Sequence, residues 1–347
     1  MNLKELSSHL GLSQTTVSRA LNGYPEVSEA TRQRVAEAAR RHNYRPNTRA
    51  KGLATGRSMA VGHVIPTSAR HEMVNPIFGD FISGAGETYA ANGYDMVLSM
   101  VDDADQPQVY RELKAKGSVD GMILHGPSIA DARIPLLREL GLPFVVHGRS
   151  SGEAQAYSWL DVNNAAAFAR ATDLLLDLGH ARIAFLNGLE KMDFAQRRRN
   201  GFERAMKARG LKLDPGQMRS EEMTESYGYQ SAKELLRAPA GPTAFLVSSV
   251  IVAIGVRRAV QEMGLVLGRD ISVITHDDDL SYLRNGGEHP LFTATRSSVR
   301  DAGRMAAQML LDQIAAPDAP LMTRLLEAPL LVGQSTGPCP PLQHAAQ

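Results

Sequence analysis

Residues 3–23, LKELSSHLGLSQTTVSRALNG, decide the fold of the N-terminal part of the chain. Apolar residues at positions 3, 6 and 10 are spaced for one helix face, and Gly11 suits a left-handed turn. Ser13 is a good N-cap for a second helix over Gln14–Leu21, and a third is expected over Glu29–His42. Three short helices with a glycine turn between the first two predict a helix-turn-helix, whose second helix enters the DNA major groove.

Charge is distributed unevenly along the chain, although the net charge is only +1. Residues 1–57 hold ten Lys/Arg against four Asp/Glu, and the remainder holds 28 against 33. A basic N-terminus on an acidic body indicates a polyanionic partner. The alternative is a solvated basic tail, and the helix-turn-helix pattern favours DNA.

Length and composition set further bounds. A chain of 347 residues suits two or three folding units, and its apolar runs are too short to span a bilayer. The N-terminus has no apolar signal core, and Cys339 has no partner cysteine. We therefore expect a cytoplasmic protein.

From Met59 onward short apolar runs alternate with amphipathic helices, many of them followed by glycine. Expected strands are 60–65, 95–101, 121–124, 144–147, 183–187, 244–247 and 272–275. Expected helices are 78–92, 107–116, 132–140, 165–178, 195–209, 228–237, 252–263 and 299–314. Such alternation predicts two parallel α/β sheets with a ligand between them, at the carboxyl ends of the strands.

Several motifs follow one another along the chain: VSRALNG at 17–23, NYRPN at 43–47, VDGMIL at 119–124, LGHARIA at 178–184 and RRNGF at 198–202. In sequence and order they resemble the lactose-repressor (LacI) family of transcription regulators. The resemblance implies an all-α helix-turn-helix domain and an α/β periplasmic-binding-protein-like core of two Rossmann-like subdomains. The implied boundaries are a helix-turn-helix at 1–46, a hinge helix at 47–57, an N-terminal subdomain at 58–161 and 290–319, a C-terminal subdomain at 162–289 and 320–338, and a tail at 339–347.

The resemblance also implies the residues that contact DNA. Base-reading positions fall at Gln14, Thr15 and Arg19, and these side chains suit adenine and guanine edges. The remaining DNA contacts expected are Thr16, Ser18, Asn22, Asn47, Ala50 and Leu53. Thr16 and Ser18 suit phosphates, and Leu53 is the hinge leucine that enters the minor groove. A solvated Arg19 and a plain flexible linker at 46–56 are the alternatives.

Six residues are expected to face the ligand cleft by family position: Phe78, His125, Arg149, Asp161, Arg198 and Asp277. Each has a structural alternative: core packing for Phe78, a loop role for His125, a solvated face for Arg198, and capping for Asp161 and Asp277. Two departures from the family pattern put the pocket chemistry in doubt. Ser248-Ser249-Val250 replaces alanine-asparagine-aspartate, and Gly148 replaces an aspartate.

The function implied is a homodimeric repressor on a palindromic operator, released by a small sugar such as the α-glucoside sucrose. A regulator with a nucleobase or sugar phosphate as co-repressor is the main alternative, and a periplasmic solute-binding protein is a remote one.

Three other motifs offer rival readings. GRSSG at 148–152 fits a hydrolase nucleophile pattern, but no amphipathic helix follows it. GAG at 84–86 lies within an expected helix, which makes dinucleotide binding a weak interpretation. His276 with its three following aspartates lacks the partners of a metal site. We therefore expect no enzymatic activity, no metal and no cofactor.

Overall fold

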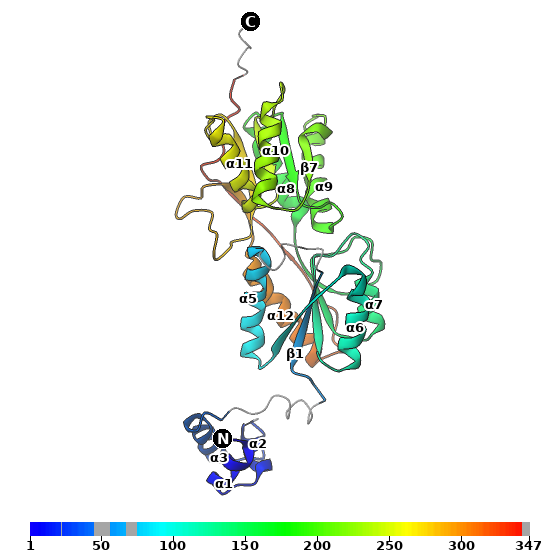
Figure 1. Cartoon of the computed structure of the whole chain (residues 1–347), viewed down its shortest axis with the longest axis vertical. Helices are drawn as coiled ribbons and strands as arrows, with labels where there is room; N and C mark the ends of the chain where they lie inside the picture. Colours follow the sequence, from blue (N-terminus) through cyan, green and yellow to red (C-terminus); the bar gives the residue numbers. More distant parts are fainter. Residues whose placement is uncertain (22, 45–55, 67–74, 342–347) are drawn as a thin grey trace.

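The computed structural model describes residues 1–21, 23–44, 56–66 and 75–341. Figure 1 shows three N-terminal helices apart from two α/β lobes that are stacked along the long axis. The first lobe lies next to the N-terminal helices, and the second lobe lies beyond it. The expected fold class, a helix-turn-helix followed by a two-part α/β core, is confirmed.

The N-terminal helices are α1 (Leu3–Leu10), α2 (Gln14–Leu21) and α3 (Glu29–Arg41). Asn2 and Glu5 form a capping box on α1, and Gly11 ends that helix at φ +66°. The Ser13 hydroxyl accepts a hydrogen bond from the backbone N–H of Thr16 at the start of α2. Apolar side chains from all three helices bury one another in a small core around Leu6, Val17 and Val35. This core leaves one side of α2 exposed.

The first lobe contains a six-stranded sheet with the order β11-β5-β4-β3-β1-β2, and every strand pair in it is parallel. Its strands are β1 (Ala60–Pro66), β2 (Asp95–Val101), β3 (Gly121–His125), β4 (Phe144–His147), β5 (Ser158–Val162) and β11 (Thr323–Leu326). Its helices are α5 (Pro76–Ala91), α6 (Gln106–Ala115), α7 (Arg133–Glu139) and α12 (Val299–Ala315). One hydrophobic cluster lies between the sheet and α5 and α12, and another lies on the α6 and α7 side.

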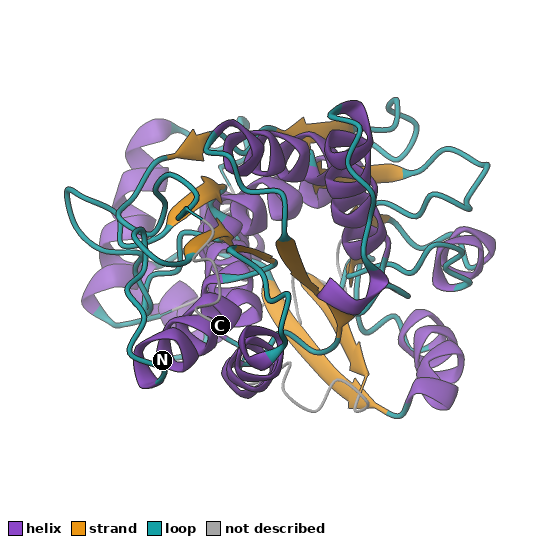
Figure 2. Ribbon diagram, turned by 90° about the horizontal axis from the view of Figure 1, so that it is seen from above, coloured by secondary structure: helices purple, strands orange, loops and turns teal. Residues whose placement is uncertain are grey.

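The second lobe has a similar sheet with the order β12-β10-β9-β8-β6-β7, in which β12 pairs antiparallel with β10 and the other strand pairs are parallel. Its strands are β6 (Ile183–Asn187), β7 (Met218–Ser220), β8 (Ala244–Val247), β9 (Ser272–Asp277), β10 (Thr293–Arg296) and β12 (Leu330–Leu331). Its helices are α8 (Asn164–Asp177), α9 (Asp193–Ala208), α10 (Glu225–Arg237) and α11 (Val250–Glu262). Figure 2 shows helices flanking the strands, as expected for sheets buried on both faces.

The chain crosses between the lobes three times, but two crossings differ from the expected boundaries. The strand β10 pairs with β9 in the second lobe, although 290–319 was assigned to the N-terminal subdomain. The strand β11 pairs with β5 in the first lobe, although 320–338 was assigned to the C-terminal subdomain. The physical reason is strand pairing, because each segment adds a strand to the sheet that it pairs with. Neither segment contains an apolar run that would predict a strand from the sequence.

Short strands account for the elements that the sequence did not predict. The strands β7, β10, β11 and β12 have two to four residues each, and β5 (Ser158–Val162) includes two buried polar residues, so no apolar run marks them. All seven expected strands and the eleven expected helices other than the hinge helix are present within a few residues of their predicted ends. None of the described helices is long and apolar enough to cross a membrane.

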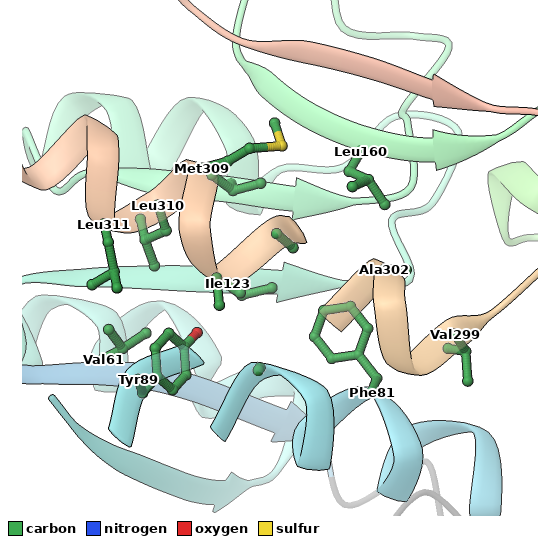
Figure 3. Close-up of a cluster of buried hydrophobic side chains, with 14 of the residues drawn as sticks. Val61, Phe81, Tyr89, Ile123, Leu160, Val299, Ala302, Met309, Leu310 and Leu311 are labelled. Carbon is green, nitrogen blue, oxygen red and sulfur yellow. The ribbon is translucent and has the colours of Figure 1, made fainter. Parts of the chain in front are cut away.

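Two glycines set the contact between α5 and α12. A Cβ atom on Gly84 would lie 2.0 Å from the backbone oxygen of Arg300, and one on Gly303 would lie 2.2 Å from that of Phe81. Figure 3 shows the resulting packing, in which the Phe81 ring lies against α12 beside Ala302. The motif at 84–86 therefore serves helix packing rather than dinucleotide binding.

We predict that Gly84→Ala destabilises the first lobe, because its methyl group would meet backbone that has no flexible side chain to move aside. The free energy of unfolding should fall by about 1–3 kcal/mol, measured by chemical denaturation. Gly79→Ala is the matched control in the same helix, because a Cβ there has nothing within 4 Å. Equal stability of the two variants would contradict this account.

Candidate DNA-binding surface and ligand cavity

The helix α2 presents the expected base-reading residues to solvent. Gln14, Thr15 and Arg19 are exposed, whereas Thr16 and Ser18 are half-buried. The Thr16 hydroxyl lies 2.8 Å from that of Ser13, at the N-cap of the helix. Arg19 lies 3.6 Å from the Glu26 carboxylate, a surface ion pair of little strength that DNA phosphates and bases can displace. The surface therefore has the form that a recognition helix requires.

Four of the expected DNA contacts lie outside the described residues. These are Asn22, Asn47, Ala50 and Leu53. The hinge helix expected at 47–57 falls almost wholly within that part of the chain, and it stays a prediction.

A cavity of about 190 Å³ lies between the two lobes, at the carboxyl ends of the strands in both sheets. Five of the six expected ligand residues line it: Phe78, His125, Arg149, Asp161 and Arg198. Parallel strands in both lobes end at the same crevice, so side chains distant in sequence meet there. The expected position of the cleft is confirmed, and the binding role of these residues stays a proposal.

Asp277 is not among the residues that line the cavity, and its neighbour Asp278 is. Asp277 is the last residue of β9, where its carboxylate accepts a hydrogen bond from the backbone N–H of Asp279 at 2.9 Å. Its backbone oxygen accepts another from Ser297. Because successive side chains of a strand point to opposite faces, Asp277 serves the turn and Asp278 faces the cavity.

A chain of polar contacts runs along the cavity wall. Arg149 Nε donates to Asp161 Oδ2 at 2.7 Å, and Asn164 Nδ2 reaches Asp161 Oδ1 at 3.5 Å. Arg198 Nε in turn donates to Asn164 Oδ1 at 2.8 Å, and its Nη1 donates to the backbone oxygen of Ser248 at 2.6 Å. This network joins the end of β4 in the first lobe to α9 in the second.

Arg198 is only 6% exposed, which is unusual for a charged side chain. Its guanidinium lies 4.9 Å from the ring centroids of both Phe168 and Phe194. Burial lowers the pKa of Arg198 to about 10, while Asp278 and Asp161 act in the opposite direction. The side chain therefore remains charged at neutral pH and holds fixed positive charge at the cavity. Burial raises the pKa of Asp161, and Arg149 opposes that effect.

Three histidines, the buried His63 and the half-buried His125 and His147, lie on the first-lobe side of the cavity. His63 Nδ1 lies 2.8 Å from His125 Nε2, and the His147 ring stacks on Phe81 with centroids 4.2 Å apart. Burial lowers the pKa of His63 to about 3 and that of His147 to about 4, and it lowers the pKa of His125 well below the usual value. The cavity therefore meets neutral imidazoles.

Several lining residues were missed at the sequence level. They are Asn75, Ile77, Phe81, His147, Asn164, Met192, Phe194, Met223, Ser248, His276, Asp278, Ser297 and Ser298, with a few small residues. Many of them directly follow a strand or start a helix after one, so the strand ends were the signal that could have found them. The apolar members form two walls, one from α5 and α12 and one around Phe194 and Met223.

The rival interpretations find no support in the geometry. Ser150 of the GRSSG segment is 5% exposed, its hydroxyl donates to the Ile129 backbone oxygen at 2.8 Å, and the segment leads into β5 rather than a helix. Among the described residues no three His, Cys, Asp or Glu side chains gather as metal ligands. His276 instead bonds to Thr295 at 3.0 Å and to Ser297 at 3.2 Å.

An exposed recognition helix joined to a two-lobed core with a polar cavity defines a ligand-responsive DNA-binding regulator. Two family models match the chain: "Bacterial regulatory proteins, lacI family" over residues 2–47, and "Periplasmic binding protein-like domain" over residues 172–336. The chain is 44% identical to the HTH-type transcriptional regulator AglR of Rhizobium meliloti, over 98% of this chain and 95% of that one. The chain belongs to the LacI family of bacterial transcriptional regulators.

Other relatives agree with this assignment. The HTH-type transcriptional regulator RafR of Escherichia coli is 34% identical, over 80% of this chain and 82% of its own length. A solved lac repressor dimer bound to operator and the anti-inducer ONPF matches with a TM-score of 0.78 at 25% identity, covering 97% of this chain and 99% of that one. A CelR–cellobiose complex matches with a TM-score of 0.70 at 26% identity, covering 96% and 99%. The curated relatives named here are transcriptional regulators rather than enzymes.

We predict that acid weakens the fold through His63, His125 and His147, whose pKa values are lowered. An imidazole with a lowered pKa in the folded state stabilises the protein above the unfolded pKa of about 6.5, and this stability is lost as the pH falls toward the folded value. The loss approaches about 1.4 kcal/mol per pH unit for each such histidine. The melting temperature should therefore drop between pH 7.5 and 5.5.

His147→Phe keeps the ring stacking on Phe81 and removes one titrating group, so its melting temperature should drop less over the same interval. His289→Gln, which changes an exposed histidine between β9 and β10, is the control that should behave like the parent. An identical acid response of the parent and His147→Phe would rule out this source of pH sensitivity.

Proposed function

We propose that the protein is a repressor that binds a palindromic operator as a homodimer and is released by a neutral sugar of the α-glucoside type. It acts in the cytoplasm and has no catalytic role. The single observation that carries the choice of ligand is the balance of charge around the cavity.

The charged side chains that line the cavity, among the described residues, are two arginines and two aspartates. Arg149 is already paired with Asp161, and Arg198 is already bonded to Asn164 and to the Ser248 backbone. A sugar phosphate requires a surplus of cations, and here it would meet Asp161 and Asp278. A neutral polyol instead uses the remaining donors and acceptors of both signs.

The apolar walls suit the same ligand. Phe78, Phe194 and Met223 can pack on the C–H surface of a pyranose, while the polar chain between them contacts its hydroxyls. The CelR structure is a complex with the disaccharide cellobiose, which supports a sugar in this fold. The resemblance of the LHGP (124–127) and HGR (147–149) segments to α-glucoside-responsive regulators supports the α-glucoside class, and sucrose is our specific choice.

Operator binding requires two copies of the chain. A single recognition helix reads too few base pairs, and half-sites one helical turn apart need a symmetric dimer. The edge strand β2 carries exposed Leu98 and Met100, and Tyr282 in the second lobe is 92% exposed. We assign these apolar side chains to contact with a second copy of the chain. The lac repressor solved with its operator is likewise a dimer.

The repressor leaves the operator because the bound sugar shifts the equilibrium between two arrangements of the lobes. Contacts between lobes flank the cavity: Ser151 N donates to Asp193 Oδ2 at 2.7 Å, and Ser281 N donates to Asp80 Oδ2 at 2.7 Å. A ligand that bridges Arg149 and Arg198 favours one arrangement of the two lobes. In that arrangement the dimer no longer holds both hinge segments, 47–57, in register on the operator.

We predict that Arg198→Met yields a repressor that sugar no longer releases. The substitution keeps the aromatic packing volume but removes a fixed charge and its hydrogen bonds, so the sugar concentration for half-release should rise roughly 10- to 100-fold. An operator mobility-shift titration with sucrose measures this directly.

Arg199→Met is the matched control on the same helix, because Arg199 pairs with Glu190 and Glu203 at the surface and lies outside the cavity.

Arg19→Ala should lose operator affinity and keep sugar binding, and an operator cut to one half-site should bind the parent weakly. Tighter operator binding on adding sugar would make the protein co-repressed, and release by a purine or phosphorylated sugar alone would overturn the ligand class.

A further inference from the structure

Two buried polar atoms at the carboxyl ends of β6 and β8 have no hydrogen-bond partner among the described residues. They are Ser248 Oγ and Asn187 Oδ1. Ser248 is 1% exposed and Asn187 is fully buried, and Ser248 lines the cavity. A buried polar atom without a partner is costly, so such atoms usually meet a partner in the functional state.

The strand register places these two residues side by side. Leu186 of β6 is paired with Val247 of β8, so Asn187 and Ser248 form the next pair, and Ser248 N donates to the Leu186 backbone oxygen at 3.0 Å. Phe185 and Leu246, two residues earlier on each strand, both point into the core beneath α8 and α9. Side chains two apart on a strand share a face, so Asn187 and Ser248 face α9 together.

The orientation of the Asn187 amide is fixed by its neighbours. Asn187 Nδ2 donates to the Ala195 backbone oxygen at 2.9 Å and to Glu190 Oε1 at 3.1 Å. Both partners are acceptors, so the oxygen side of the amide must be the one without a partner. Ser248 and Asn187 together therefore offer one hydroxyl, which can donate a hydrogen bond, and one carbonyl oxygen, which accepts. We call this pair of side chains the recess.

The backbone around the recess is held in place. Arg198 Nη1 donates to the Ser248 backbone oxygen, and the next residue, Ser249, caps α11 by accepting from the Val252 N–H at 3.3 Å. The Ser249 hydroxyl is thus engaged in the helix cap, whereas the Ser248 hydroxyl is not. A single sequence position separates a capping serine from a serine with an unsatisfied hydroxyl at the cavity.

We propose that Ser248 and Asn187 form a recess that recognises one hydroxyl group of the bound sugar. The sugar oxygen accepts a hydrogen bond from Ser248 Oγ, and the sugar O–H donates to Asn187 Oδ1. A ligand hydroxyl is the group that complements this pair, because it donates and accepts through one atom. An ether, a fluorine or a hydrogen at that position leaves at least one protein atom unpartnered. This inference rests on the proposed sugar-binding function and makes Ser248 a specificity-determining residue.

The test is calorimetric titration of the full-length protein with the parent α-glucoside and with its monodeoxy analogues. The parent protein should lose affinity at least 10-fold for one analogue, because a site built around a hydroxyl strongly rejects a ligand that lacks it. Ser248→Ala should bind the parent sugar at least 10-fold more weakly than the unmodified protein does. It should bind that one analogue with the same affinity as the unmodified protein. Ser248→Cys, similar in size with a weak S–H donor, should fall between the two.

Ser249→Ala is the matched control: it loses the helix cap and some thermal stability but keeps the hydroxyl preference. If Ser248→Ala binds the sugar and every analogue like the parent, the recess holds solvent only and the inference fails. If no neutral sugar binds the parent protein, the proposed function fails before the recess is tested. A sugar that binds with no single hydroxyl dependent on Ser248 overturns the recess alone.

Discussion

The burial of one positive charge, Arg198, constrains the rest of the ligand site. A buried guanidinium is tolerated only when its donors have partners and its faces are covered. Here the partners are Asn164 and the Ser248 backbone, and the faces are Phe168 and Phe194. Each partner is the end of a strand or the start of a helix, so the second lobe presents its strand ends in a fixed geometry. Asn164 then passes the network on to Asp161, and through it to Arg149 of the first lobe.

This arrangement explains how the two lobes can move relative to each other although the cavity residues are held in place. The chain crosses between the lobes immediately after β5, β10 and β11, so the cavity residues lie next to the segments that must bend. Hydrogen bonds such as those from Ser151 N to Asp193 and from Ser281 N to Asp80 join the two lobes. A ligand that adds bonds between the lobes can therefore shift the balance between lobe arrangements.

How far the sequence predicts this site depends on which physical signal each residue carries. Phe78, His125, Arg149, Asp161 and Arg198 follow from strand ends and from the family resemblance, and all line the cavity. The prediction that Asp277 faces the cavity missed by one residue, since Asp278 lines it instead. Four consecutive polar residues give no signal for where β9 stops pairing. Ser248 was noted only as a departure from the family pattern. Its unpartnered hydroxyl depends on the register of β6 against β8, which no local pattern encodes.

The central claim is that the balanced charge of the cavity selects a neutral sugar. Calorimetry on the full-length protein, with neutral α-glucosides including sucrose, monosaccharides, sugar phosphates and purines as separate ligands, tests it most directly. The account predicts that a neutral α-glucoside binds and that its phosphorylated counterpart binds far more weakly, because Asp161 and Asp278 repel the phosphate. Binding of a purine or a sugar phosphate while every neutral sugar fails would contradict it.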